Sequence, residues 1–315
     1  MFEKAQMVFM HCQTPLHAGS GGGVGFIDLP IQREVQNDFP TIYGSGIKGA
    51  IKAWCRGADG SLTKEMKALF GADVAAGEGA YRESDDHNSA LSFTDARILA
   101  FPVKSLNGLF AWVTCPLALA KYRQDLNLVF GNGANAITPE IPVLEAGECQ
   151  TSSNSCLKVH EEHVVLEDSV FHVEGHCDGW RDELSNRIFG SEADTRDYWK
   201  TKFDTSLVVL SDQDFGDFVT RSTQVAPRIR IDFETGRVER GALWYEECLP
   251  ADTILYTLAL AGRPTRQPYN TEDVDWVMDQ LRERVLTGDP CLQFGGDETV
   301  GKGLVKLIAA KEEVA

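Results

Sequence analysis

Residues 228–246 read RIRIDFETGRVERGALWYE and carry a clear strand–turn–strand pattern. Ile229, Ile231 and Phe233 alternate with polar residues, Glu234–Gly236 supply a turn, and an apolar residue opens the return strand. Period-two alternation on both sides of a glycine-containing turn is typical of a β-hairpin. The segment therefore predicts a hairpin over 228–246.

Outside this hairpin, helices and strands are interspersed. Segment 272–286 is the clearest helix, because its apolar residues repeat at helical spacing, Thr271 can cap its start and Gly288 can stop it. The remaining pattern predicts helices from about 46 and over 117–130, 181–190 and 212–221, and strands near 6–11, 90–100, 109–114, 157–175 and in the C-terminal LVKLIAA. No regular βαβα rhythm is present, which favours an α+β fold over a doubly wound sheet.

Length and composition exclude several classes of protein. A chain of 315 residues buries enough surface to fold without disulfides or a structural metal. A hydrophobic share of 43% with 24% charged residues is ordinary for a globular protein and argues against wholesale disorder. No run of eighteen apolar residues predicts a membrane span, and the first residues do not resemble a signal peptide. The eight scattered cysteines are interpreted as reduced thiols of a cytoplasmic protein.

The formal net charge of −17 argues against nucleic-acid binding, but the charge is unevenly distributed. Residues 1–56 hold five basic and four acidic side chains, whereas 140–199 hold four basic and fourteen acidic ones. Residues 220–240 are again less acidic, with five arginines and three acidic side chains. An acidic body with two less acidic patches suits a protein that binds a polyanion on one face; a merely solubilising acidic surface is the alternative.

A glycine-rich segment, LHAGSGGGVG (16–25), is a candidate anion site. Glycines let backbone amides approach a phosphate, so the loop that includes Gly19 and Ser20 is a candidate phosphate contact. The segment matches neither the dinucleotide-binding nor the P-loop motif. His17 is a candidate RNA contact or acid–base group, with a structural loop histidine as the alternative.

The next segment, FIDLPIQRE (26–34), places an acid beside that loop. Asp28 is a candidate ligand of a divalent ion, and Arg33 a candidate phosphate contact. From the residues alone, a turn-capping aspartate is the more common role for Asp28.

Segment YGSGIKGAIKAWCR (43–56) predicts a helix with one basic face. Ser45 is a candidate N-cap, and Lys48, Lys52 and Arg56 follow at intervals of four residues. Amides at the helix start together with this stripe would suit a phosphate backbone. A solvated basic face is the alternative.

A metal site is a weaker alternative in a region rich in histidine and cysteine. Zinc requires clustered soft ligands, but no CxxC pair is present and the spacing is irregular. The candidates are Cys149, Cys156, His160, His163, His172, His176 and Cys177.

Taken together, LHAGSGGGVGFIDLPIQRE (16–34), PTIYGSGIKGAIKAW (40–54) and GGDETVGKGLVKL (295–307) resemble the RAMP superfamily of CRISPR systems. IDLPIQRE and the hairpin segment IRIDFETGRVERGALWYEECLP (229–250) look specifically like the repeating backbone subunit of type III-B (Cmr) effector complexes. The resemblance spans nearly the whole chain.

This resemblance implies a single domain over 1–315: a ferredoxin-like (RRM-type) palm with inserted elements and a protruding, thumb-like hairpin, for which 228–246 is the candidate. It also implies partners: CRISPR RNA, target single-stranded RNA, other copies in a filament and other Cmr subunits, with guide pairing supplying sequence specificity.

For the site, the resemblance implies that Asp28 cleaves target RNA with a divalent metal ion such as Mg²⁺. The implied reaction is attack of a 2′-hydroxyl on the adjacent phosphate at regularly spaced positions. The resemblance also implies that Lys48 contacts the backbone of the guide RNA. The RNA-binding residues expected from motifs and resemblance are His17, Gly19, Ser20, Arg33, Ser45, Lys48, Lys52, Arg56 and Lys302.

Two other functions remain open from the sequence alone. One is a non-cleaving RNA-binding scaffold of the same superfamily, in which Asp28 only caps a turn. The other is a stand-alone zinc hydrolase that uses the histidine- and cysteine-rich region.

Overall fold

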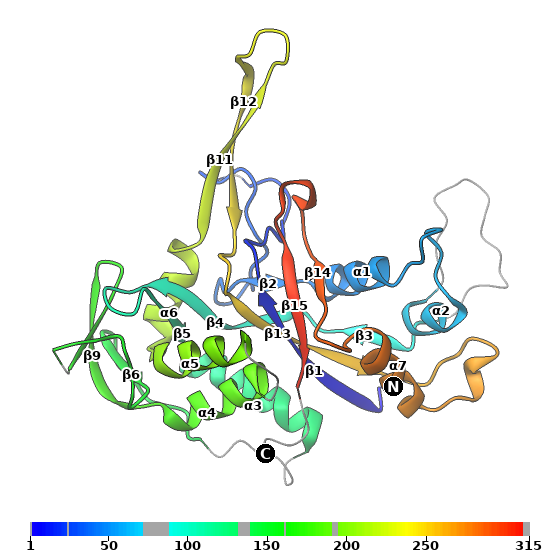
Figure 1. Cartoon of the computed structure of the whole chain (residues 1–315), viewed down its shortest axis with the longest axis horizontal. Helices are drawn as coiled ribbons and strands as arrows, with labels where there is room; N and C mark the ends of the chain where they lie inside the picture. The colour runs from blue at the N-terminus through cyan, green and yellow to red at the C-terminus, as the bar shows by residue number, and fades with distance from the viewer. Residues whose placement is uncertain are drawn as a thin grey trace.

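The computed structural model describes residues 2–23, 25–71, 88–131, 139–160, 162–190 and 195–310, with the side chains of 195–197 left out of the description. Within these residues the protein is an α+β fold built on one large mixed sheet, from which a two-stranded ribbon stands away (Figure 1). The predicted α+β class is confirmed. None of the described helices has the length and apolar character required to span a bilayer.

Four antiparallel strands form the centre of the sheet. Their spatial order is β15 (Leu304–Ala309), β1 (Lys4–Cys12), β13 (Ile254–Ala261) and β4 (Ala96–Lys104). Every side chain of β1 from Gln6 to Cys12 is buried. Since successive side chains point to opposite sides of a strand, both faces of β1 are covered. Val8, Met10 and Cys12 pack into one core cluster and Met7 and Phe9 into the other, while the polar Gln6 and His11 are also buried.

Helices cover both faces. Helix α1 (Gly44–Trp54) lies between β1 and β4 in the chain, and α7 (Val274–Arg284) lies between β13 and β15. Together with α2 (Lys64–Phe70) and α6 (Asp212–Arg221), they build one core cluster. The second cluster contains α3 (Pro116–Phe130), α4 (Asp178–Phe189) and α5 (Thr195–Ser206).

The sheet continues beyond the central strands on both sides. One extension runs from β4 through β5 (Phe110–Thr114), β10 (Leu207–Leu210), β6 (Glu148–Thr151), β9 (Ser169–His176), β8 (His163–Leu166) and β7 (Lys158–Val159). Pairs β5–β10 and β6–β9 are parallel, which makes the sheet mixed. At the other edge lies β14 (Cys291–Gln293), and two short strands, β2 (Thr41–Ile42) and β3 (Leu91–Phe93), pair with β4 and β13.

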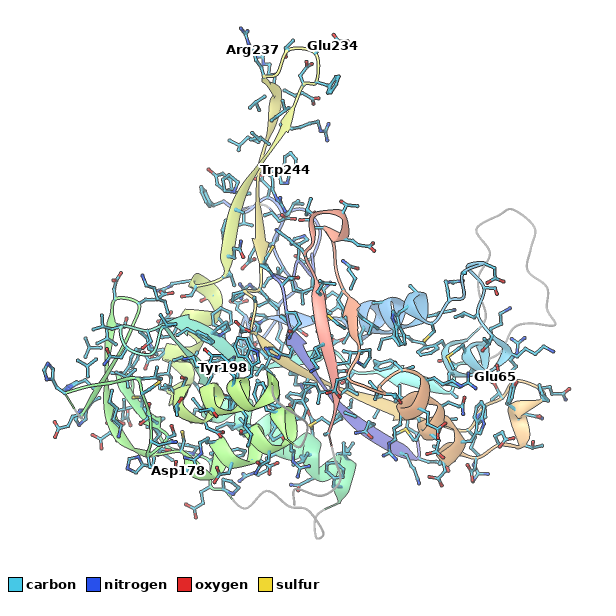
Figure 2. The ribbon with its side chains drawn as sticks, in the orientation of Figure 1. Glu65, Asp178, Tyr198, Glu234, Arg237 and Trp244 are labelled. Carbon is cyan, nitrogen blue, oxygen red and sulfur yellow. The ribbon has the colours of Figure 1, made fainter. Side chains whose placement is uncertain are left out.

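The protruding ribbon consists of β11 (Gln224–Ile231) and β12 (Val238–Cys248), which pair antiparallel. It extends past the predicted 228–246 at both ends. Figure 2 places Glu234 and Arg237 at its tip and Trp244 closer to its base. The outer residues of β12 are mostly exposed, whereas the last residues, Glu246–Cys248, are buried in the body.

Two predicted helix starts are wrong. Helix α1 begins after Tyr43, so Ser45 lies inside its first turn rather than at its N-cap, and the Gly44 N–H donates to Asp95 Oδ1 at 2.7 Å. Helix α7 is capped by Asp273, whose side chain accepts from the Trp276 N–H. In α7 the cap comes from the adjacent Asp273, whereas in α1 Tyr43 makes no side-chain cap bond and Asp95, directly before β4, bonds the first helical N–H instead.

Candidate active site at the hairpin base

Segment 16–34 lies along the base of the hairpin and adds backbone pairing to it. The Leu29 N–H donates to the Tyr245 carbonyl at 3.0 Å, and the Glu247 N–H donates to the Leu29 carbonyl at 3.0 Å. Leu29 and Glu246 form a parallel bridge, and Leu16 bridges Leu249. The segment that carries Asp28 is thus attached to β12, although the two are more than 200 residues apart in the chain.

The Asp28 carboxylate is exposed but fixed. Its Oδ2 accepts a hydrogen bond from the Tyr245 N–H at 2.7 Å, and its carbonyl accepts from the Gly23 N–H at 2.8 Å. No further hydrogen bond to this carboxylate is found within the described ranges. Asp28 does cap a backbone N–H, but that group belongs to the hairpin and not to its own turn, so the carboxylate is oriented relative to β12.

His17 is nearly buried beneath two glycine-rich loops. Its Nδ1 lies 2.6 Å from the Glu247 carbonyl, to which it donates. A Cβ at Gly19 would lie 2.7 Å from Nε2, and a Cβ at Gly295 would lie 2.2 Å from the His17 carbonyl oxygen. Only glycine therefore permits this close approach, which brings segments 19–23 and 295–303 together over His17.

The exposed part of the first loop begins at Gly19 and Ser20. The Gly19 carbonyl accepts from Gln32 Nε2 at 2.9 Å, and the Ser20 N–H donates to the Pro30 carbonyl at 3.0 Å. These bonds fold the loop back on the segment that follows Asp28. The loop surface is therefore continuous with the carboxylate.

Arg33, expected to contact phosphate, is held by the protein. Its Nη2 lies 2.5 Å from Glu247 Oε1, and its Nη1 donates to the Asp38 and Val219 carbonyls. Glu247 is only 2% exposed and also accepts from Thr223 Oγ1 at 2.8 Å. The guanidinium neutralises a buried carboxylate and ties segment 16–34 to the hairpin.

Lys302 is also engaged at the hairpin base. Its Nζ lies 2.9 Å from Glu246 Oε2 and 3.0 Å from Cys248 Sγ, while Arg228 Nε donates to Glu246 Oε2 at 2.8 Å. Arg228 Nη2 also donates to Asp297 Oδ2 at 2.8 Å. Burial opposes ionisation of Glu246, but the hydrogen bonds and charges of this network outweigh it and hold its pKa at about 2.

The predicted basic stripe forms a separate group, but only Lys48 and Lys52 lie on α1, because the helix ends at Trp54 and Arg56 follows its C-cap, Cys55. Lys48 donates to Ser89 Oγ, Lys52 to the Gly71 carbonyl and Arg56 to the Gly60 carbonyl, while Ser45 is exposed in the first turn. Burial, and secondarily the charge of Lys52, lowers the pKa of Lys48. The start of α1 is linked to the hairpin-base segment through the Tyr43 N–H, which donates to Gln32 Oε1 at 2.7 Å.

A metal cage is absent from the described part of the chain: no three His, Cys, Asp or Glu side chains are placed to hold an ion. In the histidine- and cysteine-rich region, the His163 and His172 rings lie 5.3 Å apart, but the thiols of Cys149 and Cys177 are buried, which raises the pKa of each to about 12. This arrangement gives the zinc alternative no support. Asp28 fits the different pattern of Mg²⁺, which takes one or two carboxylates and completes its shell with phosphate oxygens and water.

Sequence reasoning missed the acids that organise the site, Glu246 and Glu247. A signal was present, because GALWYEECLP (241–250) places two adjacent acids within an otherwise apolar run. Acids in such a place need partners, since isolated buried charges are strongly disfavoured. Their partners could not be identified because they lie in three distant segments.

Comparison with known proteins agrees with this architecture. A model of the RAMP superfamily matches residues 9–306. The chain belongs to the RAMP superfamily. It is 34% identical over 307 residues to the CRISPR system Cmr endoribonuclease Cmr4 of Pyrococcus furiosus, covering 96% of this chain and 95% of that protein.

Solved structures of RAMP proteins share the fold along the whole chain. The crystal structure of oligomeric Cmr4 from Pyrococcus furiosus superposes with a TM-score of 0.71 at 27% identity, covering 98% of this chain and 99% of the other. A chain of the type III-B Cmr-beta complex in its apo state superposes with a TM-score of 0.69 at 25% identity, covering 99% of both.

Proposed function

We propose that this protein is the repeating backbone subunit of a type III-B CRISPR RNA-guided effector complex and cleaves target RNA within that complex. Membership of the RAMP superfamily, the endoribonuclease named among its relatives and the oligomer formed by one of them support this function. The observation that carries the catalytic part is the exposed Asp28 carboxylate, anchored to the hairpin through the Tyr245 N–H.

The same proposal includes the finer fold. Strand order β15–β1–β13–β4, with α1 and α7 as the two connecting helices, supports a ferredoxin-like palm. Residues 105–253 enter between the second and third palm strands and carry both the sheet extension and the hairpin. We assign the hairpin as the thumb and 1–315 as one domain.

The proposed reaction is transfer within the target strand. The 2′-oxygen attacks the adjacent phosphorus, the bond from phosphorus to the 5′-oxygen breaks, and the products are a 2′,3′-cyclic phosphate and a 5′-hydroxyl. The proton of the 2′-hydroxyl leaves as the 5′-oxygen gains one. A divalent ion, with Mg²⁺ as the expected one, would be bound by Asp28 and would stabilise the charge on the phosphate.

Guide RNA would be bound through its backbone by the glycine loop at Gly19 and Ser20, by the α1 stripe (Ser45, Lys48 and Lys52) and by Arg56, which follows the end of the helix. We assign Arg33 and Lys302 to holding the site through Glu247 and Glu246. His17 would shape the loop that carries the phosphate contacts, because it is nearly buried and Gly19 closes over its Nε2.

The test is Asp28→Asn in the assembled complex. Loss of the metal-binding charge removes several kcal/mol of transition-state stabilisation, so target cleavage should fall by at least about 100-fold while assembly and target binding persist. Asp38→Asn is a matched control, because Asp38 is an exposed acid of the neighbouring segment with a positive φ of 58° that asparagine tolerates.

Wild-type cleavage by the Asp28→Asn complex would contradict the catalytic assignment. That result would favour the non-cleaving scaffold, with Asp28 acting only to fix the hairpin base. Co-purification of RNA of a discrete length would support the guide-binding part in either case.

A further inference from the structure

An exposed aromatic pair lies directly beside Asp28. The Phe26 ring is 77% exposed, and its centroid lies 4.8 Å from that of Tyr245 with 32° between the ring planes. Tyr245 is the same residue whose N–H holds the Asp28 carboxylate. One residue of β12 thus positions both an aromatic face and an acid.

The arrangement does not have the form of a packing contact. A phenylalanine that serves stability is buried, whereas Phe26 keeps most of its surface in water at the cost of exposing a large apolar side chain. Within the part of the chain that the structure describes, Tyr245 is the one ring in contact with Phe26. With 77% of its surface exposed, Phe26 leaves room for a second flat ring.

The spacing suits a nucleotide. Phe26 and Asp28 are two residues apart, so their Cα atoms lie within about 7 Å of each other. The Gly23 N–H, bound to the Asp28 carbonyl at 2.8 Å, closes the loop that carries Phe26. A base on Phe26 and a phosphate at Asp28 would then belong to the same or to adjacent nucleotides.

We propose that Phe26, supported by Tyr245, is a stacking subsite for an unpaired base of the target strand next to the phosphate that is cut. This proposal rests on the proposed function and adds a substrate contact to it. Aromatic side chains bind splayed bases of single-stranded RNA by stacking, without selecting a sequence. The subsite fixes the nucleotide on one side of the phosphate, and Asp28 acts on the phosphate itself.

The test is a cycle that removes the ring and the base separately. Four assembled complexes are compared: wild type, Phe26→Ala, Phe26→Leu and Phe26→Trp. Each is given three target RNAs, one unmodified, one abasic on the 5′ side of each cut and one abasic on the 3′ side. Single-turnover rates are measured at several target concentrations. Phe26→Ala and Phe26→Leu should cut the unmodified target about tenfold more slowly, and Phe26→Trp at close to the wild-type rate.

The abasic targets distinguish stacking from a structural role. The wild-type complex should cut one of the two abasic targets about tenfold more slowly than the unmodified target. The Phe26→Ala complex should cut that abasic target at the same rate as the wild-type complex, because the stacking contact is already lost when the base is missing. Wild-type rates for Phe26→Ala would overturn the proposal. It would also be overturned if the tenfold loss persisted on both abasic targets, which would indicate that Phe26 contacts protein instead.

Failure of this subsite is separable from failure of the proposed function. Phe2→Ala, at an exposed phenylalanine near the N-terminus, controls for loss of an aromatic ring. If Asp28→Asn is inactive and Phe26→Ala is fully active, only the stacking subsite is wrong. If the wild-type complex itself does not cut target RNA, the proposed function is wrong.

Discussion

The hairpin base and helix α1 both carry basic residues that the sequence predicts to meet RNA, and the structure uses them differently. At the hairpin base, Arg33 and Lys302 form ion pairs with the buried acids Glu247 and Glu246. On α1, the bonds described for Lys48 and Lys52 end at a hydroxyl and a carbonyl, which are neutral groups. The number of basic residues in a sequence therefore does not give the positive charge available for RNA, because some of these residues neutralise buried acids.

The strongest test of this comparison is Glu247→Ala. Removing one partner of a buried pair leaves the Arg33 guanidinium without its counter-charge and should cost about 3–5 kcal/mol of unfolding free energy. Urea unfolding of the isolated protein measures it. Lys48→Ala should cost less than about 1 kcal/mol, because it removes a hydrogen bond to a neutral group. Equal destabilisation by the two substitutions would contradict the comparison.

The second test uses pH. The pKa of Glu246 is held at about 2 in the folded protein, below the ordinary value of 4.5, so its contribution to stability is complete above pH 4.5 and declines as the pH falls toward 2. Glu246→Gln should therefore cost roughly 2–3 kcal/mol at pH 7 and clearly less at pH 3. Unfolding measured at both values checks this, and a loss that does not depend on pH would show that Glu246 acts only by packing.

The third test separates the tip of the hairpin from its base. Deleting Glu234–Gly236 should leave the unfolding free energy unchanged within about 0.5 kcal/mol, because turn tips are exposed and tolerate change. Figure 2 shows Glu234 and Arg237 far from the body of the protein. The regular spacing of cleavage products should be altered or lost. An unchanged product ladder would place the inserting element elsewhere.

The smallest effect is expected on α1. Lys48→Ala with Lys52→Ala should weaken RNA binding on all sequences alike and reduce the log–log salt slope by roughly 0.7–0.9 for each phosphate that is no longer neutralised. Lys64→Ala with Lys104→Ala removes the same charge from exposed positions and should change the slope less. Equal slopes for the two double variants would assign the α1 stripe to the solvated surface.

The local sequence pattern predicted most of the helices and strands but not the contacts between distant segments. The alternation of Ile229 and Ile231 and the helical repeat of 272–286 depend on neighbouring residues, so both were found in the sequence. Strand β13 was missed because ILYTLALA is buried along nearly its whole length and shows no alternation. The bond between Asp28 and Tyr245 joins residues 217 positions apart, and no local pattern specifies such a contact.

The site was predictable only in part for the same reason. Asp28, His17 and the glycine loop are adjacent in the chain, and the structure keeps them together. The roles of Arg33 and Lys302 depend on Glu247 and Glu246 at the base of the hairpin, which are 214 and 56 positions away in the chain. The sequence did not indicate a role for Phe26, because a sequence alone does not show whether a single phenylalanine is exposed or buried.

The attachment of Asp28 at Tyr245 fixes the base of the hairpin. Val238 and Tyr245 are seven positions apart, so the outer ribbon extends roughly 24 Å from the point of attachment. A tilt of about 10° there would carry the tip through roughly 4 Å and leave the carboxylate almost stationary, by the same strand geometry. The tip of the ribbon would then move relative to the body, while Asp28 stays at a nearly constant distance from the central strands.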